Sequence, residues 1–213
     1  MIMSIFRILI PLAFSTSLML ASGRGDDETI PTSPERIRPI LIGQKIPQLT
    51  LTTIEGIPYD VNLESGKKST ILIFYRGGWC PFCNRHLAQL RHAEPELAAL
   101  GYQLLAVSPD RPSKLRETVN KNELSYTLLS DSSMTASKAL GIAYKVDERV
   151  VNRYRNNGTD FEEFTGEDHH LLPVPAVFII GKDGTVRFHY INPNYRVRLD
   201  PDLLLAAARA SLQ

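Results

Sequence analysis

The only two cysteines of the chain, Cys80 and Cys83, lie two residues apart in the sequence Trp-Cys-Pro-Phe-Cys. A disulfide between residues so close together closes almost no loop, so it constrains the unfolded chain very little. A structural zinc site needs four ligands, and a c-type haem site needs a His directly after the second Cys, where this chain has Asn84. The spacing therefore favours a redox-active dithiol, and we expect no metal and no cofactor.

A buried strand and a helix are predicted to position the two thiols. Residues 70–75 (TILIFY) form a continuous apolar run typical of a central strand, and leucines recur at helical spacing over residues 80–100. In open α/β sheets, active sites are built at the carboxyl end of such strands. Unpaired backbone N–H groups and the dipole at the start of a helix favour thiolate over thiol. We expect Cys80, at an exposed first turn, to be the nucleophile and Cys83, about one turn further on, to be its more buried partner.

The residues next to this pair are candidates for supporting the chemistry. Trp79 directly precedes the nucleophile, and Pro81 fits the first turn of the helix, where its missing N–H removes no hydrogen bond. Arg76 and Arg85 would add positive charge near the sulfur if their side chains turned toward it. The commoner fate of such guanidinium groups is exposure to water, so this second interpretation is favoured.

The rest of the chain alternates strand-like and helix-like segments. A hairpin is predicted over residues 48–61, further strands over 103–108, 127–129, 176–180 and 186–190, and helices over 114–122, 134–140 and 201–212. This order predicts an α/β fold with a central mixed β-sheet flanked by helices on both faces. The content of 43% hydrophobic and 22% charged residues indicates a globular domain, and a net charge of +1 gives no electrostatic footprint for nucleic acid.

The first 40 residues differ in composition from the remainder. Residues 1–23 contain one Arg, an uncharged run over residues 8–20 and then Ala21, Ser22 and Gly23, which is the order of a secretory signal peptide. Residues 24–40 are rich in Pro, Ser, Thr and charge and are predicted to form a flexible linker before a domain over residues 41–213. We expect an exported protein, periplasmic or extracellular, that is not stably inserted in a membrane once the signal is removed. The alternative is an uncleaved N-terminal anchor, although the apolar run is short for a bilayer span of ~20 residues.

Val174 and Pro175 precede the late strand over residues 176–180. A cis bond before such a proline is a typical way to leave a backbone edge open to an extended substrate. With Trp-Cys-Pro-Phe-Cys after a buried strand, this proline resembles the active site of the thioredoxin fold. The phrases LLAVSPD, LSYTLLSD, LLPVPAVFIIGKDGTVRF and INPNYRVRLDP make the chain from Leu41 onward similar to the peroxiredoxin-like branch of the alkyl hydroperoxide reductase/thiol-specific antioxidant (AhpC/TSA) family.

This resemblance implies a thioredoxin-like fold and a thiol-dependent peroxidase. Cys80 would be oxidised by a hydroperoxide to the sulfenic acid, Cys83 would condense with it, and thioredoxin or another dithiol donor would reduce the resulting disulfide. The chain departs from the family at three positions: it has Ile73 and Gly77 where typical members have Pro and Thr or Ser, and Pro175 where they have an Arg. Positioned donors stabilise the charge that develops on the leaving oxygen, so peroxide turnover is expected to be slow.

Two other functions use the same dithiol. The local Trp-Cys-x-x-Cys and the candidate cis proline favour a thiol-disulfide oxidoreductase acting on exported protein disulfides, and a redox sensor is the third possibility. Residues 147–168 form an insertion that would cover the active site or contact a partner. Arg196 and Arg198 belong to the family-like phrase NYRVRLDP, or they anchor the C-terminal segment to the sheet by salt bridges.

Overall fold

The strand-helix-strand unit predicted around the cysteines is present in the computed structural model, which describes residues 30–212. Strand β3 (Thr70–Phe74) leads through helix α2 (Pro81–Ala99) to strand β4 (Gln103–Ser108), and β3 pairs with β4 in parallel. All five residues of β3 are buried, as expected of a strand covered on both faces.

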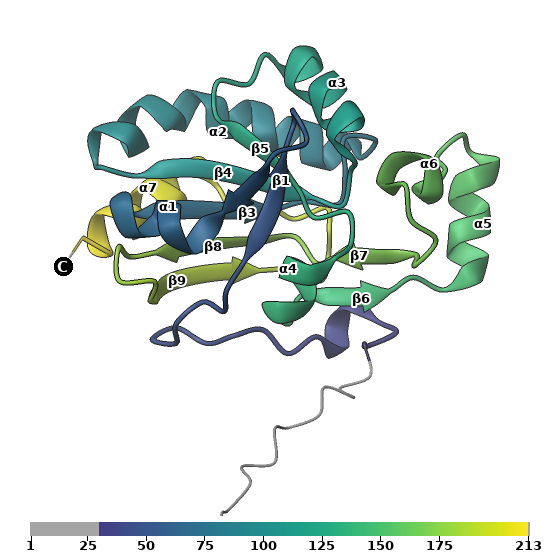
Figure 1. Ribbon diagram of the computed structural model, residues 1–213, viewed down its shortest axis with the longest axis horizontal. Helices are drawn as coiled ribbons and strands as arrows, with labels where there is room; N and C mark the ends of the chain where they lie inside the picture. The colour runs from purple at the N-terminus through teal and green to yellow at the C-terminus, as the bar shows by residue number, and fades with distance from the viewer. Residues whose placement is uncertain (1–29, 213) are drawn as a thin grey trace, which may run out of the picture.

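A seven-stranded mixed sheet surrounds this unit, in the order β2-β1-β5-β4-β3-β8-β9 (Figure 1). Only the β3/β4 and β4/β5 pairs are parallel, and the remaining pairs of this sheet are antiparallel. The predicted hairpin is confirmed as β1 and β2, and the late strands as β8 and β9. The bounds of the other strands of this sheet are β1 Thr50–Thr53, β2 Pro58–Asp60, β5 Thr127–Ser130, β8 Ala176–Ile180 and β9 Val186–Ile191.

Helices cover both faces of the sheet, because alternate side chains of a strand point to opposite sides. Ile71 and Ile73 of β3 face a cluster formed with α2, α3 and α7, whereas Leu72 and Phe74 face a cluster formed with α1, α4 and residues 37–46. The bounds of these helices are α1 Val61–Lys67, α3 Pro112–Asn122, α4 Thr135–Ala139 and α7 Pro201–Ala210. The predicted α/β fold with helices on both faces is therefore confirmed.

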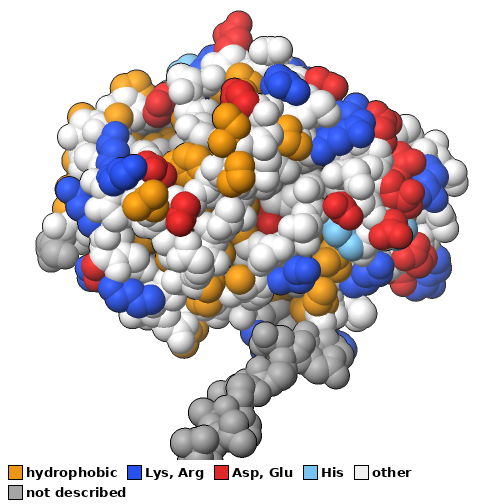
Figure 2. Space-filling model, viewed as in Figure 1, with side chains coloured by type: hydrophobic (Ala, Val, Ile, Leu, Met, Phe, Trp, Pro, Cys, Tyr) orange, Lys and Arg blue, Asp and Glu red, His pale blue; other side chains and the backbone are white. Residues whose placement is uncertain are grey.

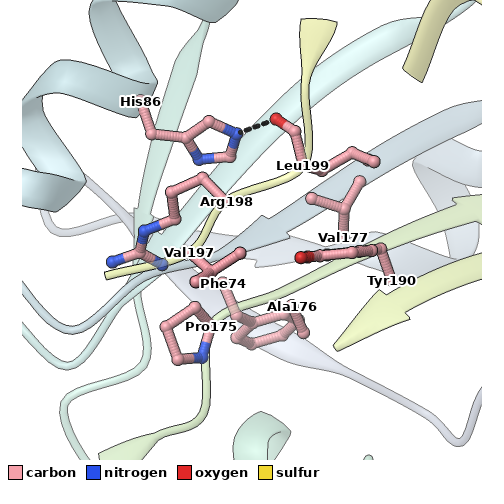
Figure 3. Close-up of a pocket in the computed structure, with 9 residues that line it drawn as sticks. All are labelled: Phe74, His86, Pro175, Ala176, Val177, Tyr190, Val197, Arg198 and Leu199. Carbon is pink, nitrogen blue, oxygen red and sulfur yellow. Dashed lines mark hydrogen bonds between the residues drawn. The ribbon is translucent and has the colours of Figure 1, made fainter. Parts of the chain in front are cut away.

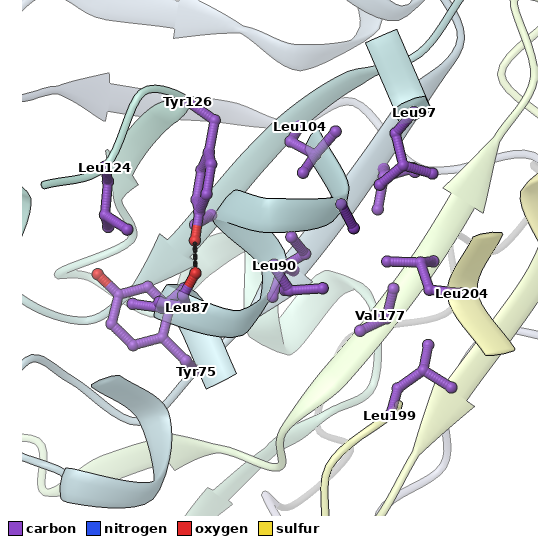
Figure 4. Close-up of a cluster of buried hydrophobic side chains, with 14 of the residues drawn as sticks. Tyr75, Leu87, Leu90, Leu97, Leu104, Leu124, Tyr126, Val177, Leu199 and Leu204 are labelled. Atoms are coloured by element: carbon purple, nitrogen blue, oxygen red, sulfur yellow. Dashed lines mark hydrogen bonds between the residues drawn. The ribbon is translucent and has the colours of Figure 1, made fainter. Parts of the chain in front are cut away.

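The cluster between the sheet and α2 is the larger apolar core (Figure 4). Leu87 and Leu90 of α2 are fully buried in it. The Tyr126 hydroxyl donates a hydrogen bond of 2.8 Å to the Leu87 carbonyl, which satisfies the polar end of a buried ring. Each buried Leu stabilises the fold by about 1.5–3 kcal/mol, and this helix face fixes where the first turn of α2 stands.

The insertion over residues 147–168 is helical, which the sequence analysis did not predict. A small sheet of β6 (Ala143–Lys145) and β7 (Leu171–Pro173) brackets helices α5 (Glu148–Asn156) and α6 (Phe161–Thr165). Asp147 and Asp160 cap the two helices by accepting hydrogen bonds from backbone N–H groups. Both helices stand beside the end of the sheet where β3 leads into α2 (Figure 1). Acidic and basic side chains gather on the outer surface of these two helices (Figure 2).

The segment predicted as a flexible linker is, in its described part, attached to the domain. The Lys145 N–H donates to the Pro31 carbonyl, and the N–H groups of Arg38 and Ile40 donate to the carbonyls of Gly141 and Leu140. The prediction of a solvated linker is therefore wrong for residues 30–40, because backbone hydrogen bonds and apolar packing hold these residues against the domain. The predicted signal peptide, residues 1–23, lies outside the described residues. Over residues 30–212, no helix is both long and apolar enough to cross a bilayer.

Candidate active site

The first turn of α2 is built around the two cysteines. Cys80 is the N-cap residue, with extended backbone, and Pro81 occupies the first helical position as predicted. The N–H groups of Cys83 and Asn84 donate to the Cys80 carbonyl at 3.0 and 3.1 Å, which closes the turn. Both thiols are free and lie one turn apart at the positive end of the helix.

Both cysteines are buried, so the prediction that Cys80 is exposed is wrong. Each is only 1% exposed. Both belong to the apolar cluster between the sheet and α2. The helical insertion, which we call the α5–α6 cover (residues 147–168), packs on the residue directly before Cys80. The Trp79 ring packs against Tyr154 of α5 at 5.3 Å and against Phe161 of α6 at 5.2 Å between ring centroids. Of the two roles considered for this insertion, these contacts favour covering the active-site loop at Trp79.

Arg76 lies inside this aromatic cluster rather than in water. It is 3% exposed. Its guanidinium lies 4.8, 5.5 and 4.1 Å from the ring centroids of Trp79, Tyr154 and Tyr195, and it donates a hydrogen bond of 3.0 Å to the Tyr154 hydroxyl. The favoured interpretation, exposure to water, is therefore wrong for Arg76 and correct for Arg85, which is exposed on α2. Within residues 30–212, no carboxylate forms an ion pair with Arg76. Cation–π contacts stabilise its desolvated guanidinium instead.

Arg198 provides a second positive charge, at the other sulfur. Its Nη2 donates to Cys83 Sγ at 3.1 Å. The sequence analysis left this residue as either a family feature or an anchor by salt bridges, and within the described chain it makes a hydrogen bond to sulfur and no ion pair. Figure 3 shows Arg198 in a small pocket next to His86 and Pro175. Arg198 and Cys83 are 115 positions apart in sequence, so no local sequence pattern could have predicted their contact.

These surroundings shift the two thiols in opposite directions. The hydrogen bond from the Cys83 thiol, the Cys83 backbone N–H and the charges of Arg76 and Arg198 together lower the pKa of Cys80 to about 6. Burial raises the pKa of Cys83 well above its ordinary value, and its hydrogen bond to the Cys80 sulfur acts in the same direction. At neutral pH the site therefore holds a Cys80 thiolate beside a neutral Cys83 thiol.

The loop before Cys80 is tightly packed and needs glycine. Gly77 has φ of +142°, and a Cβ atom there would overlap Trp79 Nε1. The Gly78 N–H donates to Asp110 Oδ2 at 2.7 Å, so the loop is held by a carboxylate that follows β4. Burial raises the pKa of Asp110 to about 7. The sequence analysis missed Asp110, although its place just after a buried strand, in SPD, was a usable signal.

Val174 and Pro175 do not form an open edge. No peptide bond among the described residues is cis, so the candidate cis proline is wrong. Val174 N–H donates to the Ile142 carbonyl and the Pro175 carbonyl accepts from Asn192 N–H, at 2.9 and 3.2 Å. Because Ile142, just before β6, and Asn192, just after β9, already bond to this backbone, an extended substrate has no free edge here. Pro175 instead lines the pocket that holds Arg198.

No group of three or more His, Cys, Asp or Glu side chains in residues 30–212 is arranged to hold a metal ion. His86 of α2 is buried, and its Nε2 lies 3.2 Å from the Leu199 carbonyl. A carbonyl only accepts, so Nε2 carries the proton. Burial and the charge of Arg198 lower the pKa of His86 to about 4, which keeps the ring neutral.

Comparisons with known proteins agree with this arrangement. The AhpC/TSA family model matches residues 42–189. The chain is 30% identical over 148 residues to the putative peroxiredoxin bcp of Haemophilus influenzae, covering 64% of this chain and 95% of that protein. It is 30% identical over 107 residues to peroxiredoxin Bcp of Escherichia coli K12, covering 50% of this chain and 67% of that protein.

Two solved structures share the fold. Reduced Prx3 of Vibrio vulnificus in complex with H₂O₂ superposes with a TM-score of 0.65 at 18% identity, covering 79% of this chain and 99% of that one. Peroxidoxin BcpB of Mycobacterium tuberculosis gives 0.60 at 20% identity, covering 79% and 96%. These similarities confirm the thioredoxin-like fold.

Proposed function

Because the chain belongs to the AhpC/TSA family, we propose that it is a thiol-dependent peroxidase whose reacting atom is the sulfur of Cys80. The observation that carries this proposal is the asymmetry of the dithiol. Cys80 is ionised at the start of a helix with Arg76 and Arg198 nearby, and a neutral thiol that can react with its oxidised form lies one turn away. A two-cysteine peroxidase needs one nucleophilic thiolate that attacks the peroxide and a second thiol that reacts only after the first is oxidised.

The cycle follows from this geometry. The Cys80 thiolate attacks one oxygen of a hydroperoxide, the O–O bond breaks, and the leaving oxygen takes a proton to become an alcohol or water. Cys80 is then a sulfenic acid. Cys83 attacks its sulfur and the hydroxyl leaves as water, which gives a Cys80–Cys83 disulfide. An external dithiol supplies the two electrons that restore both thiols, and we propose that the donor is a thioredoxin-like protein.

The site lacks two groups that typical family members use to bind the peroxide. No hydroxyl is present at Gly77 and no guanidinium at Pro175. Arg76 and Arg198 place positive charge beside the dithiol from other parts of the chain. These charges stabilise the thiolate, but no described contact shows a donor aimed at the leaving oxygen. Slow peroxide turnover therefore stays our prediction.

A thiol-disulfide oxidoreductase acting on exported proteins is the alternative, and the backbone beside Pro175 argues against it. The backbone beside Pro175, where an extended substrate would pair, is already hydrogen-bonded. A hydroperoxide needs no such backbone edge, so this observation favours the peroxidase.

Stopped-flow oxidation of the reduced protein by hydrogen peroxide tests the proposal. We expect the native protein and the Cys83→Ser variant to be oxidised faster than an unstructured peptide thiol, with a sulfenic acid trapped in the variant. Cys80→Ser should not react above the peptide rate. A native rate equal to that of the peptide would overturn the peroxidase, and rapid oxidation or reduction of protein disulfides would support its rival.

We also propose that the protein is exported to the periplasm or the outside of the cell. The support is compositional: the uncharged run over residues 8–20 followed by small residues at 21–23. Cell fractionation and N-terminal sequencing of the mature protein test this. Recovery from the periplasm or medium with a new N-terminus near residue 24 is expected, and retention in the membrane at full length would support an uncleaved anchor.

A further inference from the structure

One arginine side chain acts on each sulfur of the dithiol: Arg76 on Cys80 and Arg198 on Cys83. Arg76 lies in the aromatic cluster around Trp79 and acts on Cys80 through its charge, whereas Arg198 comes from a distant part of the chain and donates to Cys83 Sγ at 3.1 Å. A bond from a charged donor to the resolving sulfur is unexpected if Cys83 acts only as a neutral thiol. The contact points to a moment in the cycle when Cys83 is an anion.

Arg198 has little else to bind. Within residues 30–212 it forms no ion pair, and its buried Nε has no hydrogen-bond partner. His86 shares the pocket, but its ring is neutral and its Nε2 proton is directed to the Leu199 carbonyl (Figure 3). The Cys83 sulfur is therefore the atom toward which this charge is directed.

The backbone holds Arg198 firmly in place. The next residue, Leu199, is 2% exposed and packs in the core against α2. Asp200 then caps α7 by accepting from the Asp202 N–H at 2.9 Å. A buried anchor and a helix cap on its C-terminal side make Arg198 a preorganised donor rather than a mobile surface charge.

We propose that Arg198 is a catalytic residue of the reductive half of the cycle, where it stabilises Cys83 as the leaving thiolate. This rests on the proposed function. A donor thiolate attacks Cys80 Sγ, a new S–S bond forms to the donor, and the Cys80–Cys83 bond breaks with its electron pair on Cys83. The anion accepts the Arg198 hydrogen bond and later takes a proton from water. The donor's second thiolate then attacks the donor sulfur of the mixed disulfide, so the donor is oxidised and Cys80 leaves as a thiolate.

The chemistry of disulfide exchange requires such a donor here. Exchange is faster when the leaving sulfur is a more stable anion. Burial destabilises a Cys83 anion, so without a positive charge the enzyme would be slow to regenerate. The charge-assisted bond from Arg198 offsets this burial at the atom where the charge appears.

The test compares Arg198→Met with Arg196→Met, a neighbouring exposed arginine whose loss changes the net charge equally. The disulfide is formed with diamide, which needs no peroxidase chemistry, and its reduction by dithiothreitol is followed by the fluorescence of Trp79, the only tryptophan of the chain. We expect Arg198→Met to slow reduction by roughly tenfold to a hundredfold, since bonds to charged groups are among the strong ones. Arg198→Lys should recover much of the rate, and Arg196→Met should stay within about twofold.

A second measurement separates catalysis from a structural role. Oxidation by hydrogen peroxide uses the Cys80 thiolate, so Arg198→Met should change it much less than it changes reduction. Equal slowing of both reactions, or unchanged reduction, would overturn the proposal. If the native protein fails to react with peroxide, the proposed function fails, while the diamide-formed disulfide still tests Arg198.

Discussion

The hydrogen bond from the Cys83 thiol is the largest contribution to the acidity of Cys80, and replacing Cys83 tests it directly. The pKa of Cys80 falls from 9.0 to about 6, which corresponds to roughly 4 kcal/mol in favour of the thiolate at about 1.4 kcal/mol per pH unit. A hydrogen bond to a charged group contributes about 1.5–3 kcal/mol. Cys83→Ala should therefore raise the pKa of Cys80 by roughly one to two pH units, to between about 7 and 8.

Cys83→Ser is the matched control, because its hydroxyl keeps a donor of similar size. Its Cys80 should titrate within about one pH unit of the native value. Because the shift is downward, the thiolate is present above pH 6 and is lost as the pH falls through that value. At pH 7 about 90% of native Cys80 is ionised, against roughly 10–50% in Cys83→Ala.

Ultraviolet thiolate absorbance and the pH dependence of alkylation by iodoacetamide measure both titrations. Alkylation at pH 7 should be about two- to tenfold slower in Cys83→Ala than in Cys83→Ser. If Cys83→Ala still titrates near pH 6, the helix start and the arginines suffice and the assigned hydrogen bond is irrelevant. If the pKa of Cys80 rises equally in Cys83→Ala and Cys83→Ser, the sulfur atom of Cys83 is required, and a hydrogen-bond donor alone does not replace it.

Three further predictions concern the structure around the dithiol. Gly78→Ala should destabilise the protein by about 1–3 kcal/mol in urea unfolding, because the new Cβ would overlap Thr118 Oγ1, whereas Gly66→Ala, which meets only open space in α1, should be neutral or stabilising. Tyr154→Phe keeps the ring against Trp79 and should leave alkylation of the cysteines nearly unchanged, whereas Tyr154→Ala should open the cover and speed alkylation severalfold; equal rates in the two variants would contradict the role of the ring. Leu90→Ala, at a fully buried site, should cost about 2–5 kcal/mol in the same unfolding assay, and a smaller loss would mean that the cluster collapses to fill the cavity.

Local patterns were sufficient for the frame of the site. The continuous apolar run of β3, the leucine spacing of α2 and the second apolar run of β4 each follow from burial periodicity, so the parallel unit and the place of Cys80 at a helix start were predictable. The α5–α6 cover was not, because α5 is short, polar and buries one residue, Val151. Its helices are stabilised by caps and by packing against Trp79. The apolar residues of α5, Val150, Val151 and Tyr154, span little more than one turn, which is too short a repeat to predict a helix.

The sequence by itself determined that two thiols one turn apart would stand at the amino end of a helix, since strand and helix periodicities are local properties of the chain. Only the tertiary structure decided their surroundings. It buried Cys80 in the cluster between the sheet and α2, enclosed Arg76 among aromatic rings, paired the backbone beside Pro175 and brought Arg198 to Cys83. The physical reason is that burial and charge at a sulfur depend on segments far apart in the chain, and only their packing sets those distances.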